Sequence, residues 1–220
     1  MISKDGTVLS NTDELKFAET VADSLREVYF TTIGNASEPL RLDLLELCEA
    51  MGGTVYEITS YSAKDDYNML EIEEGGLFSI RLNSLGHMGV PYKSSPRLAM
   101  AIGDWLLNFI NAEPGACRTY NSVYRNPKGE DAASYELAVH FGWQLLLPAD
   151  LFESVWWAEG CDYEKVAQAF GADVETVCKR ADQLNLLHAP PTSLQEQEER
   201  KRGDEHMERI VKSVLDRIAH

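Results

Sequence analysis

Two apolar helical segments, residues 96–106 and 136–148, constrain the fold of this chain more than any other feature. The first segment follows two serines that can cap a helix, and it has Pro96 in its first turn, where proline is favoured. The second segment ends at Pro148, which cannot continue a helix. We therefore expect a central helix and, after a long loop, a second helix.

The part of the chain before residue 54 is expected to be helical. Apolar residues recur at helical spacing across residues 13–30 and again across residues 40–48. Gly52 and Gly53 end the second pattern, because glycine accepts the left-handed geometry of a helix C-cap. Two helices are therefore predicted ahead of the first strand.

Three short runs predict strands. Residues 54–58 alternate and contain β-branched side chains, and similar runs follow at residues 68–73 and 77–83. The sequence Glu-Gly-Gly at residues 74–76 is a turn signal, which predicts a hairpin between the last two strands. Helices and strands in this order predict an α+β fold.

The two central segments read PRLAMAIGDWL over residues 96–106 and ELAVHFGWQLLLP over residues 136–148. They resemble the core of the ImmA/IrrE family of small metallopeptidases, whose first helix reads roughly R-F-x-L-A-H-E-L-G-H and whose second reads roughly E-A-N-x-F-A-x-x-L-L-M-P. The family also has two helices, a strand and a hairpin ahead of its metal-binding helix, so the resemblance covers most of the chain. It implies a zincin-like core of helices and a small β-sheet.

In that family, two His residues one helical turn apart bind zinc, and the Glu beside the first acts as general base. Aligned on this resemblance, the chain has Ile102 and Leu106 at the two His positions, Gly103 at the base and Leu137 at the third ligand. Apolar side chains cannot bind Zn²⁺, and glycine cannot move a proton. We therefore expect a catalytically inactive protein with no metal cofactor, in which the three apolar side chains form a dry cluster.

A metal site rebuilt from other residues is an alternative. Glu136 and His140 lie one helical turn apart, a spacing that can bind a metal ion, and Asp104 and His87 lie in nearby segments. A Glu–His pair at this spacing is more commonly a solvated, hydrogen-bonded pair. The sequence therefore favours no relocated metal site.

The chain of 220 residues carries a formal net charge of −16 and has a sequence pI near 4.7. Such a charge repels nucleic acid and anionic membranes and attracts a basic partner, although many cytosolic bacterial proteins are simply acidic. The four cysteines show no C-x-x-C spacing, and we find neither a signal region nor a stretch of transmembrane length. We expect a cytoplasmic protein.

Residues 166–177 have the spacing of a helix-turn-helix, with Gly171 at the turn, and the whole run 162–187 resembles the C-terminal helical segment of the ImmA/IrrE family. Lys179 and Arg180 are the cations on its second helix that can contact DNA, but acidic residues flank them. The sequence therefore favours a packed helical hairpin of the same geometry over direct DNA binding.

Three parts of the chain are predicted. Residues 1–148 form the zincin-like core, and residues 149–190 form the helix-turn-helix-like extension. Residues 191–220 form a charged linker and an amphipathic helix, which docks on the body of the protein or pairs with another chain, giving a homo-oligomer.

The resemblance also implies a partner, because active family members cut helix-turn-helix repressors of mobile elements or stress regulons. We expect an inactive relative to bind such a basic protein stoichiometrically, as an antirepressor or inhibitor of phage or mobile-element origin. The alternative is an acidic mimic of DNA that blocks a nucleic-acid-binding defence enzyme. The expected binding surface is an edge strand beside the loop at residues 111–128, formed by Leu77, Phe78, Ser79, Ile80, Arg81 and Leu82.

Overall fold

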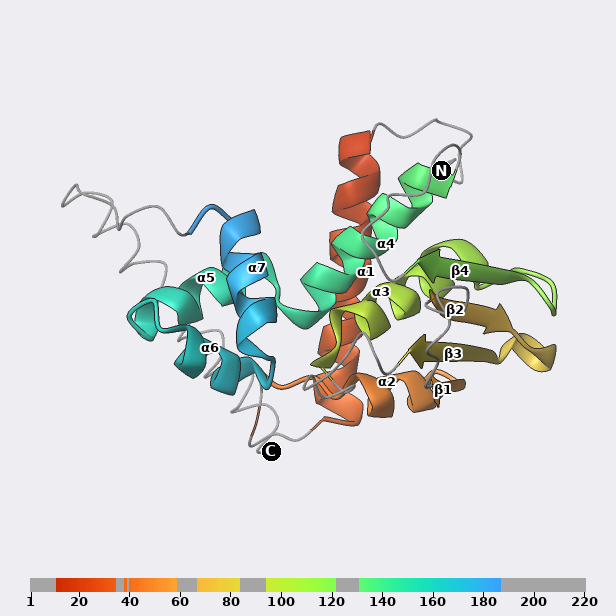
Figure 1. Cartoon of the computed structure of the whole chain (residues 1–220), viewed down its shortest axis with the longest axis horizontal. Helices are drawn as coiled ribbons and strands as arrows, with labels where there is room; N and C mark the ends of the chain where they lie inside the picture. Colours follow the sequence, from red (N-terminus) through yellow and green to blue (C-terminus); the bar gives the residue numbers. More distant parts are fainter. Residues whose placement is uncertain are drawn as a thin grey trace.

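The protein has a mixed α+β architecture, seen here in a computed structural model (Figure 1). The structure describes residues 11–34, 38, 40–58, 67–83, 94–121 and 131–186. A small sheet lies at one end of the molecule, and the C-terminal helices lie at the other end (Figure 1). Helices α1 (Asn11–Thr32), α3 (Pro96–Asp104) and α4 (Asp131–Leu146) lie between them.

The two helices predicted ahead of the first strand are confirmed. They are α1 (Asn11–Thr32) and α2 (Leu44–Ala50). Asp43 caps α2, because its side chain accepts hydrogen bonds from the first backbone N–H groups of the helix. The chain then turns at Gly52, whose φ of 82° is accessible to glycine, and enters the sheet.

The sheet contains the three predicted strands and one that sequence reasoning missed. The strands are β1 (Gly53–Ile58), β2 (Tyr67–Ile72), β3 (Phe78–Asn83) and β4 (Cys117–Asn121). Their order is β1-β3-β2-β4, with β1 parallel to β3 and the other two pairs antiparallel. The predicted hairpin joins β2 to β3, and β4 lies inside the segment that was expected to be a loop.

The prediction that residues 77–82 form an edge strand was wrong. Ile80 in the middle of β3 pairs with Val55 of β1 on one side and with Leu70 of β2 on the other. A strand with neighbours on both sides has no free backbone groups to offer to a partner. Strand addition at this position is therefore not available, and the edges of the sheet are β1 and β4.

A bulge starts the missed strand β4. Gly115 has a φ of 86°, and its N–H donates to the carbonyl of Ile72 at 2.8 Å. The N–H of Ile72 donates in turn to the carbonyl of Ala116 at 2.9 Å. Two residues of one strand thus oppose a single residue of the other, with a glycine in the left-handed region at the first position.

Both predicted central segments are helices. They are α3 (Pro96–Asp104), which continues into a π-helical segment, η4 (Trp105–Phe109), and α4 (Asp131–Leu146). Helix α4 packs against both α3 and α1 (Figure 1). The π-helical segment had no signal in the sequence.

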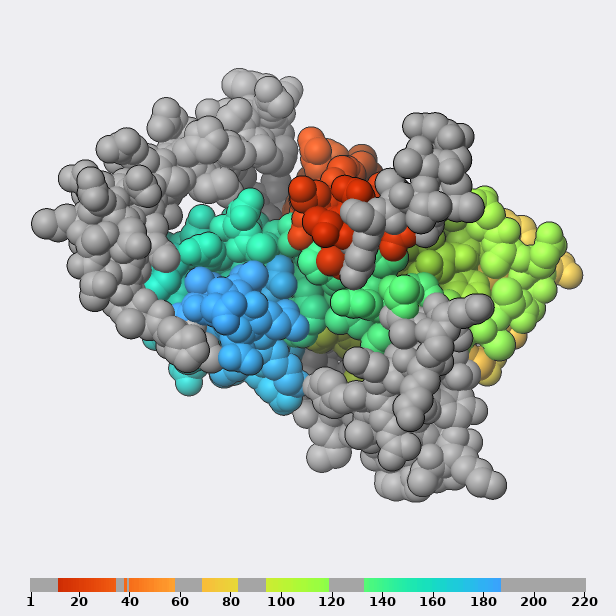
Figure 2. All heavy atoms as spheres, turned by 90° about the horizontal axis from the view of Figure 1, so that it is seen from above, coloured from red at the N-terminus to blue at the C-terminus, as the bar shows by residue number. Residues whose placement is uncertain are grey.

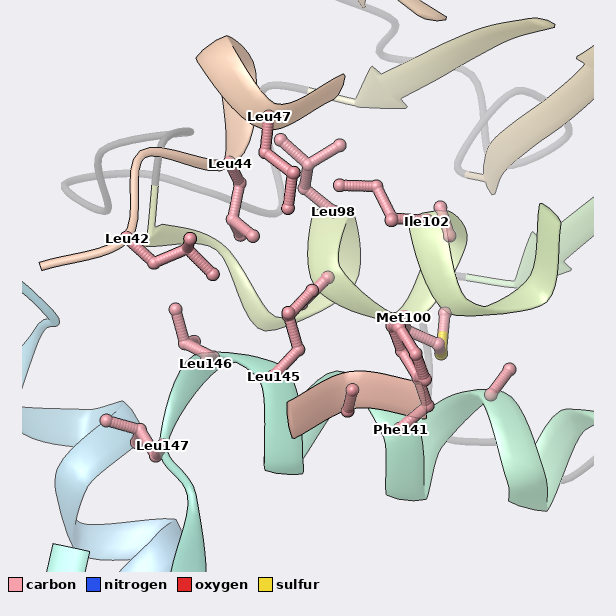
Figure 3. Packing of buried hydrophobic residues seen from close by; sticks show 14 of the residues in the cluster. Leu42, Leu44, Leu47, Leu98, Met100, Ile102, Phe141, Leu145, Leu146 and Leu147 are labelled. Carbon is pink, nitrogen blue, oxygen red and sulfur yellow. The ribbon is translucent and has the colours of Figure 1, made fainter. Parts of the chain in front are cut away.

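One continuous hydrophobic core runs through the molecule. Leucines from α2 and the segment before it face leucines of α3 and of the end of α4 (Figure 3). The buried side chains extend from α1 and the sheet to the last helix, where Val177 and Ala181 are wholly buried. The predicted boundary at residue 148 therefore marks the start of a helix, while the core continues across it.

The C-terminal helices follow at once after Pro148. They are α5 (Ala149–Ala158), α6 (Tyr163–Phe170) and α7 (Val174–Gln183). Gly171, with a φ of 67°, ends α6, and Asp173 caps α7 through the backbone N–H of Thr176. These helices pack against the end of α4 that lies away from the sheet (Figure 1, Figure 2).

Within the described ranges, we find no helix that combines the length and the apolar character required to cross a membrane. Asp13 and Glu14 lie in the first turn of α1, the longest helix. The amphipathic helix predicted within residues 191–220 lies outside the described residues.

Candidate functional site

The crossing of α3 and α4 is where the resemblance would position a catalytic centre. Gly103 is buried there, and a Cβ atom added to it would lie 2.4 Å from Cδ1 of Phe141. The position expected for a general base is therefore in direct contact with a wholly buried aromatic ring. No side chain larger than hydrogen fits at residue 103 unless this ring moves.

A second glycine brings the two helix backbones together. A Cβ atom on Gly142 would lie 2.8 Å from the backbone nitrogen of Met100 and 3.0 Å from its Cα. The helices thus approach through one glycine on each, and packed main chain and an aromatic ring fill the space between them. This arrangement fits a closed helix-helix contact and does not fit a metal ion with a bound water at this point.

The three former ligand positions behave differently from one another. Ile102 is wholly buried and Leu137 is 7% exposed, so the burial expected of both is confirmed. Leu106 in the π-helical segment is partly buried and packs against the same core. Ile102 points toward Leu47 of α2 (Figure 3), on a different side of α3 from the contact with α4. Ile102 and Leu137 belong to the general hydrophobic core, and Leu106 packs against it.

The alternative metal ligands are not brought together. His140 Nε2 lies 2.9 Å from a carboxylate oxygen of Glu19 on α1, while Glu136 is exposed. In the part of the chain that the structure describes, no group of three or more His, Cys, Asp or Glu residues is arranged to hold a metal ion. His87 lies outside the described residues.

The most deeply buried charged group is Asp104, at the last residue of α3. Its Oδ1 atom accepts a hydrogen bond from the side chain of Asn108 at 2.7 Å. The same oxygen forms an ion pair with Nη1 of Arg118 at 3.0 Å. Arg118 also lies over the ring of Phe109 and within 3.4 Å of the hydroxyl of Ser134. The network fastens the edge strand β4 to the helices. Sequence reasoning missed it, because nothing in the local pattern links residues 104 and 118.

Two buried arginines bind the carboxyl end of α4. Arg26 of α1 donates to the carbonyl of Leu145 at 2.9 Å, and Arg180 of α7 donates to that of Leu147 at 2.9 Å. These carbonyls have no partner within the helix, and they carry the negative end of its dipole. Burial lowers the pKa of both guanidinium groups to about 10, which leaves them charged at neutral pH. Both side chains are therefore structural links.

This placement bears on the helix-turn-helix interpretation. Arg180, one of the two cations that a DNA-binding second helix would offer, is 6% exposed and engaged with α4. Lys179, the other cation, lies 2.6 Å from Glu175 on the same helix. Residues 149–186 contain eight carboxylates and three basic side chains, so this unit repels phosphates. The packed helical hairpin is the interpretation that these contacts favour.

A polar cluster joins α1, α4 and α5. Gln144 donates to Asp23 at 3.0 Å and accepts from the backbone N–H of Ala149 at 3.1 Å. Burial raises the pKa of Asp23, and the nearby carboxylates of Glu19 and Asp150 raise it further. The cluster connects the core to the C-terminal helices through hydrogen bonds, with like charges held close together.

An open groove of about 570 Å³ lies between residues 38, 40 and 41 and helices α5 and α6. Arg41 spans it, donating to the carbonyl of Gln168 at 2.7 Å and pairing with Glu38 at 2.8 Å. The charged side chains that line the groove are of both signs, and some of them pair with one another. The groove therefore shows no selective chemistry for a ligand.

The surface predicted for partner binding is mostly interior. Phe78, Ile80 and Leu82 are wholly buried, and Ser79 is 2% exposed. Only the residues at two of the six positions reach solvent: Leu77 is 49% exposed, and Arg81 pairs with Glu71 at 2.8 Å on the outer face of the sheet. The free edges lie on other strands.

Comparisons with models of protein families, with curated proteins and with solved structures found no match to this chain. The resemblance to ImmA/IrrE peptidases stays a prediction. Three features of the molecule itself bear on function: the closed crossing of α3 and α4, the buried arginines that bind the carboxyl end of α4, and the strongly acidic composition.

Proposed function

We propose that this protein is a catalytically inactive, ImmA/IrrE-like pseudo-peptidase that binds a basic protein partner stoichiometrically. The contact between Gly103 and Phe141 carries the first half of the proposal, because it leaves neither a general base nor space for one. The net charge of −16 supports the second half. A basic DNA-binding protein, such as a helix-turn-helix repressor of a phage or mobile element, is the class of partner that fits.

Electrostatics give such a protein a specific role. A strongly negative surface raises the rate of encounter with a positive partner by about 10–10³-fold and rejects negatively charged competitors. A protein that holds a repressor in this way blocks its DNA-binding surface without cutting it. The fraction of repressor that is blocked then depends on the amount of the acidic protein, which must match the amount of repressor.

The experiment is affinity capture from lysate of the source cells, followed by titration with the purified partner. We expect a one-to-one complex, a partner that stays intact in mass spectrometry, and an association rate that falls as salt rises to physiological strength, where the Debye length is about 8 Å. Cleavage of the partner would contradict the proposal, and so would an association rate that salt does not change.

Metal dependence is tested on the same sample. The purified protein should contain no stoichiometric zinc, and a chelator should leave its melting temperature unchanged, because the described residues hold no group that binds a metal ion. Stoichiometric zinc whose removal lowers the melting temperature would instead support the rebuilt metal site.

A second candidate is a DNA mimic that inhibits a nucleic-acid-binding enzyme. The observation in its favour is a row of carboxylates on α1: Glu19, Asp23 and Glu27 follow one another at intervals of four residues, which is a rise of about 6 Å each. Neutralising this row to Gln, Asn and Gln should abolish inhibition by a mimic. A partner that binds the triple variant as tightly as the parent protein would exclude this candidate.

A further inference from the structure

The two edges of the sheet differ in how they are protected against pairing with another chain. Strand β4 begins with the bulge at Gly115 and carries Arg118, an inward-pointing charge bound to Asp104. Bulges and inward-pointing charges are two of the devices that keep edge strands from pairing. Strand β1 has neither, since it contains no proline, lysine or arginine and its six residues stay in continuous register with β3.

Strand β1 is also rigidly held. A Cβ atom on Gly53 would lie 2.4 Å from the ring of Phe78 and 2.5 Å from the sulfur of Cys48 on α2. The start of β1 is therefore clamped between its neighbour strand and a capped helix. An edge that is already ordered costs little conformational entropy when a partner strand is added.

Exposed apolar side chains occur on β1, just before β3 and on α2. Tyr56 in β1 is 49% exposed, Leu77 just before β3 is 49% exposed, and Leu45 on α2 is 39% exposed. Leu77 reaches back over the start of β1, since a Cβ atom on Gly52 would lie 3.0 Å from its Cδ2 atom. By the strand register, Tyr56 lies beside Arg81 on the outer face of the sheet. Aromatic side chains of this kind are common anchors in protein interfaces.

The segment that contains α2 and β1 carries charge of one sign, and Arg81 on the neighbouring strand is already paired with Glu71. Residues 42–58, which include α2 and β1, contain four carboxylates, on Asp43, Glu46, Glu49 and Glu57, and no lysine, arginine or histidine. A segment that pairs here must therefore tolerate or neutralise negative charge. A second copy of the chain would bring the same carboxylates and a further −16 of net charge to the contact, which disfavours self-pairing.

We propose that an extended, basic segment of the protein partner adds to the free edge of β1 as a fifth strand. In this arrangement its backbone pairs with β1, one side chain packs on Tyr56 and another lies toward Leu77 at the start of β1, and its cations face the carboxylates of α2 and Glu57. The inference rests on the proposed function and names the surface by which it acts. No element in the described part of the chain pairs with this side of β1.

The test uses two synthetic peptides of equal charge, one alternating Lys and Val and the other alternating Lys and Pro. The Lys-Val peptide can form a strand, whereas the Lys-Pro peptide lacks half of the backbone donors. Amide hydrogen exchange on the whole protein reports where each peptide binds. We expect the Lys-Val peptide to slow exchange at alternate amides of residues 53–58, and the Lys-Pro peptide to have no such effect.

Two matched variants separate the surface from general electrostatics. Tyr56→Lys and Phe17→Lys each add one positive charge at a half-exposed aromatic residue, on β1 and on α1 respectively; Phe17 is 45% exposed. Tyr56→Lys should weaken binding of the Lys-Val peptide at least about tenfold, which is the loss of an anchor side chain. Phe17→Lys should change it by less than about twofold, because a single distant surface charge contributes little.

The following results would overturn the proposal that a partner strand adds to β1. Equal binding of the two peptides, or protection of β4 in place of β1, leaves charge-driven partner binding intact but removes β1 as its surface. Absence of peptide binding at low salt also removes it, while the one-to-one complex with an intact partner remains the separate test of the proposed function. A homodimer that Tyr56→Lys dissociates would show that a second copy covers the edge.

Discussion

The substitution Gly103→Ala tests the closed helix crossing most directly. The added methyl carbon would lie 2.4, 2.8 and 3.1 Å from Cδ1, Cγ and Cβ of Phe141, whereas carbon atoms pack best at about 3.5–4.0 Å. Three contacts this short place the cost of overpacking near the upper end of the usual 1–3 kcal/mol. Alanine gains about 1 kcal/mol over glycine in a helix interior, so we expect a net destabilisation of about 1–2 kcal/mol.

The assay is urea denaturation followed by tryptophan fluorescence, in a double-mutant cycle with Phe141→Ala. Removing the ring alone should cost about 3–5 kcal/mol, because it leaves a cavity in the core. In that background Gly103→Ala no longer meets the ring, and it should stabilise the protein by about 1 kcal/mol. The sign of the effect thus reverses between the two backgrounds. Equal effects in both, within about 0.5 kcal/mol, would refute the reasoning that this contact closes the site.

Three further outcomes follow from buried and titratable groups. Asp104→Asn should lower the free energy of unfolding by about 3 kcal/mol, because it breaks a buried ion pair, whereas Glu71→Gln at a half-exposed pair should cost less than about 1 kcal/mol in the same denaturation assay. Burial raises the pKa of Cys48 to about 12, so a thiol reagent at neutral pH should label exposed Cys117 in the folded protein and Cys48 only after unfolding, as read by peptide mass spectrometry. Burial and nearby carboxylates raise the pKa of Asp23 above 3.8, so the native state binds its proton more tightly, and stability falls as pH rises through the folded-state pKa. Asp23→Asn should remove that fall in denaturation curves measured from acidic to neutral pH, and its persistence would contradict the assignment.

The candidate site shows how far residue identity alone can reach. The apolar identities of Ile102 and Leu137 predicted burial, and the structure confirms it, because a wholly apolar side chain on a central helix has no favourable place outside the core. Leu106 lies in the π-helical segment that follows α3, where it is partly buried and packs against the core.

The sequence by itself determined the helices ahead of the sheet, the two central helices, three of the four strands, where the β2–β3 hairpin turns, and that no general base stands at residue 103. These features depend on contacts within a few residues, such as caps, glycine turns and alternation, and such contacts can be read along the chain. Only the tertiary structure decided that β3 is interior, that β1 and β4 are the edges, and that Arg118 and Arg180 reach their buried partners. The physical reason is that strand order and buried polar contacts join residues far apart in the sequence. Many pairings satisfy the same local pattern, and packing of the whole core selects one of them.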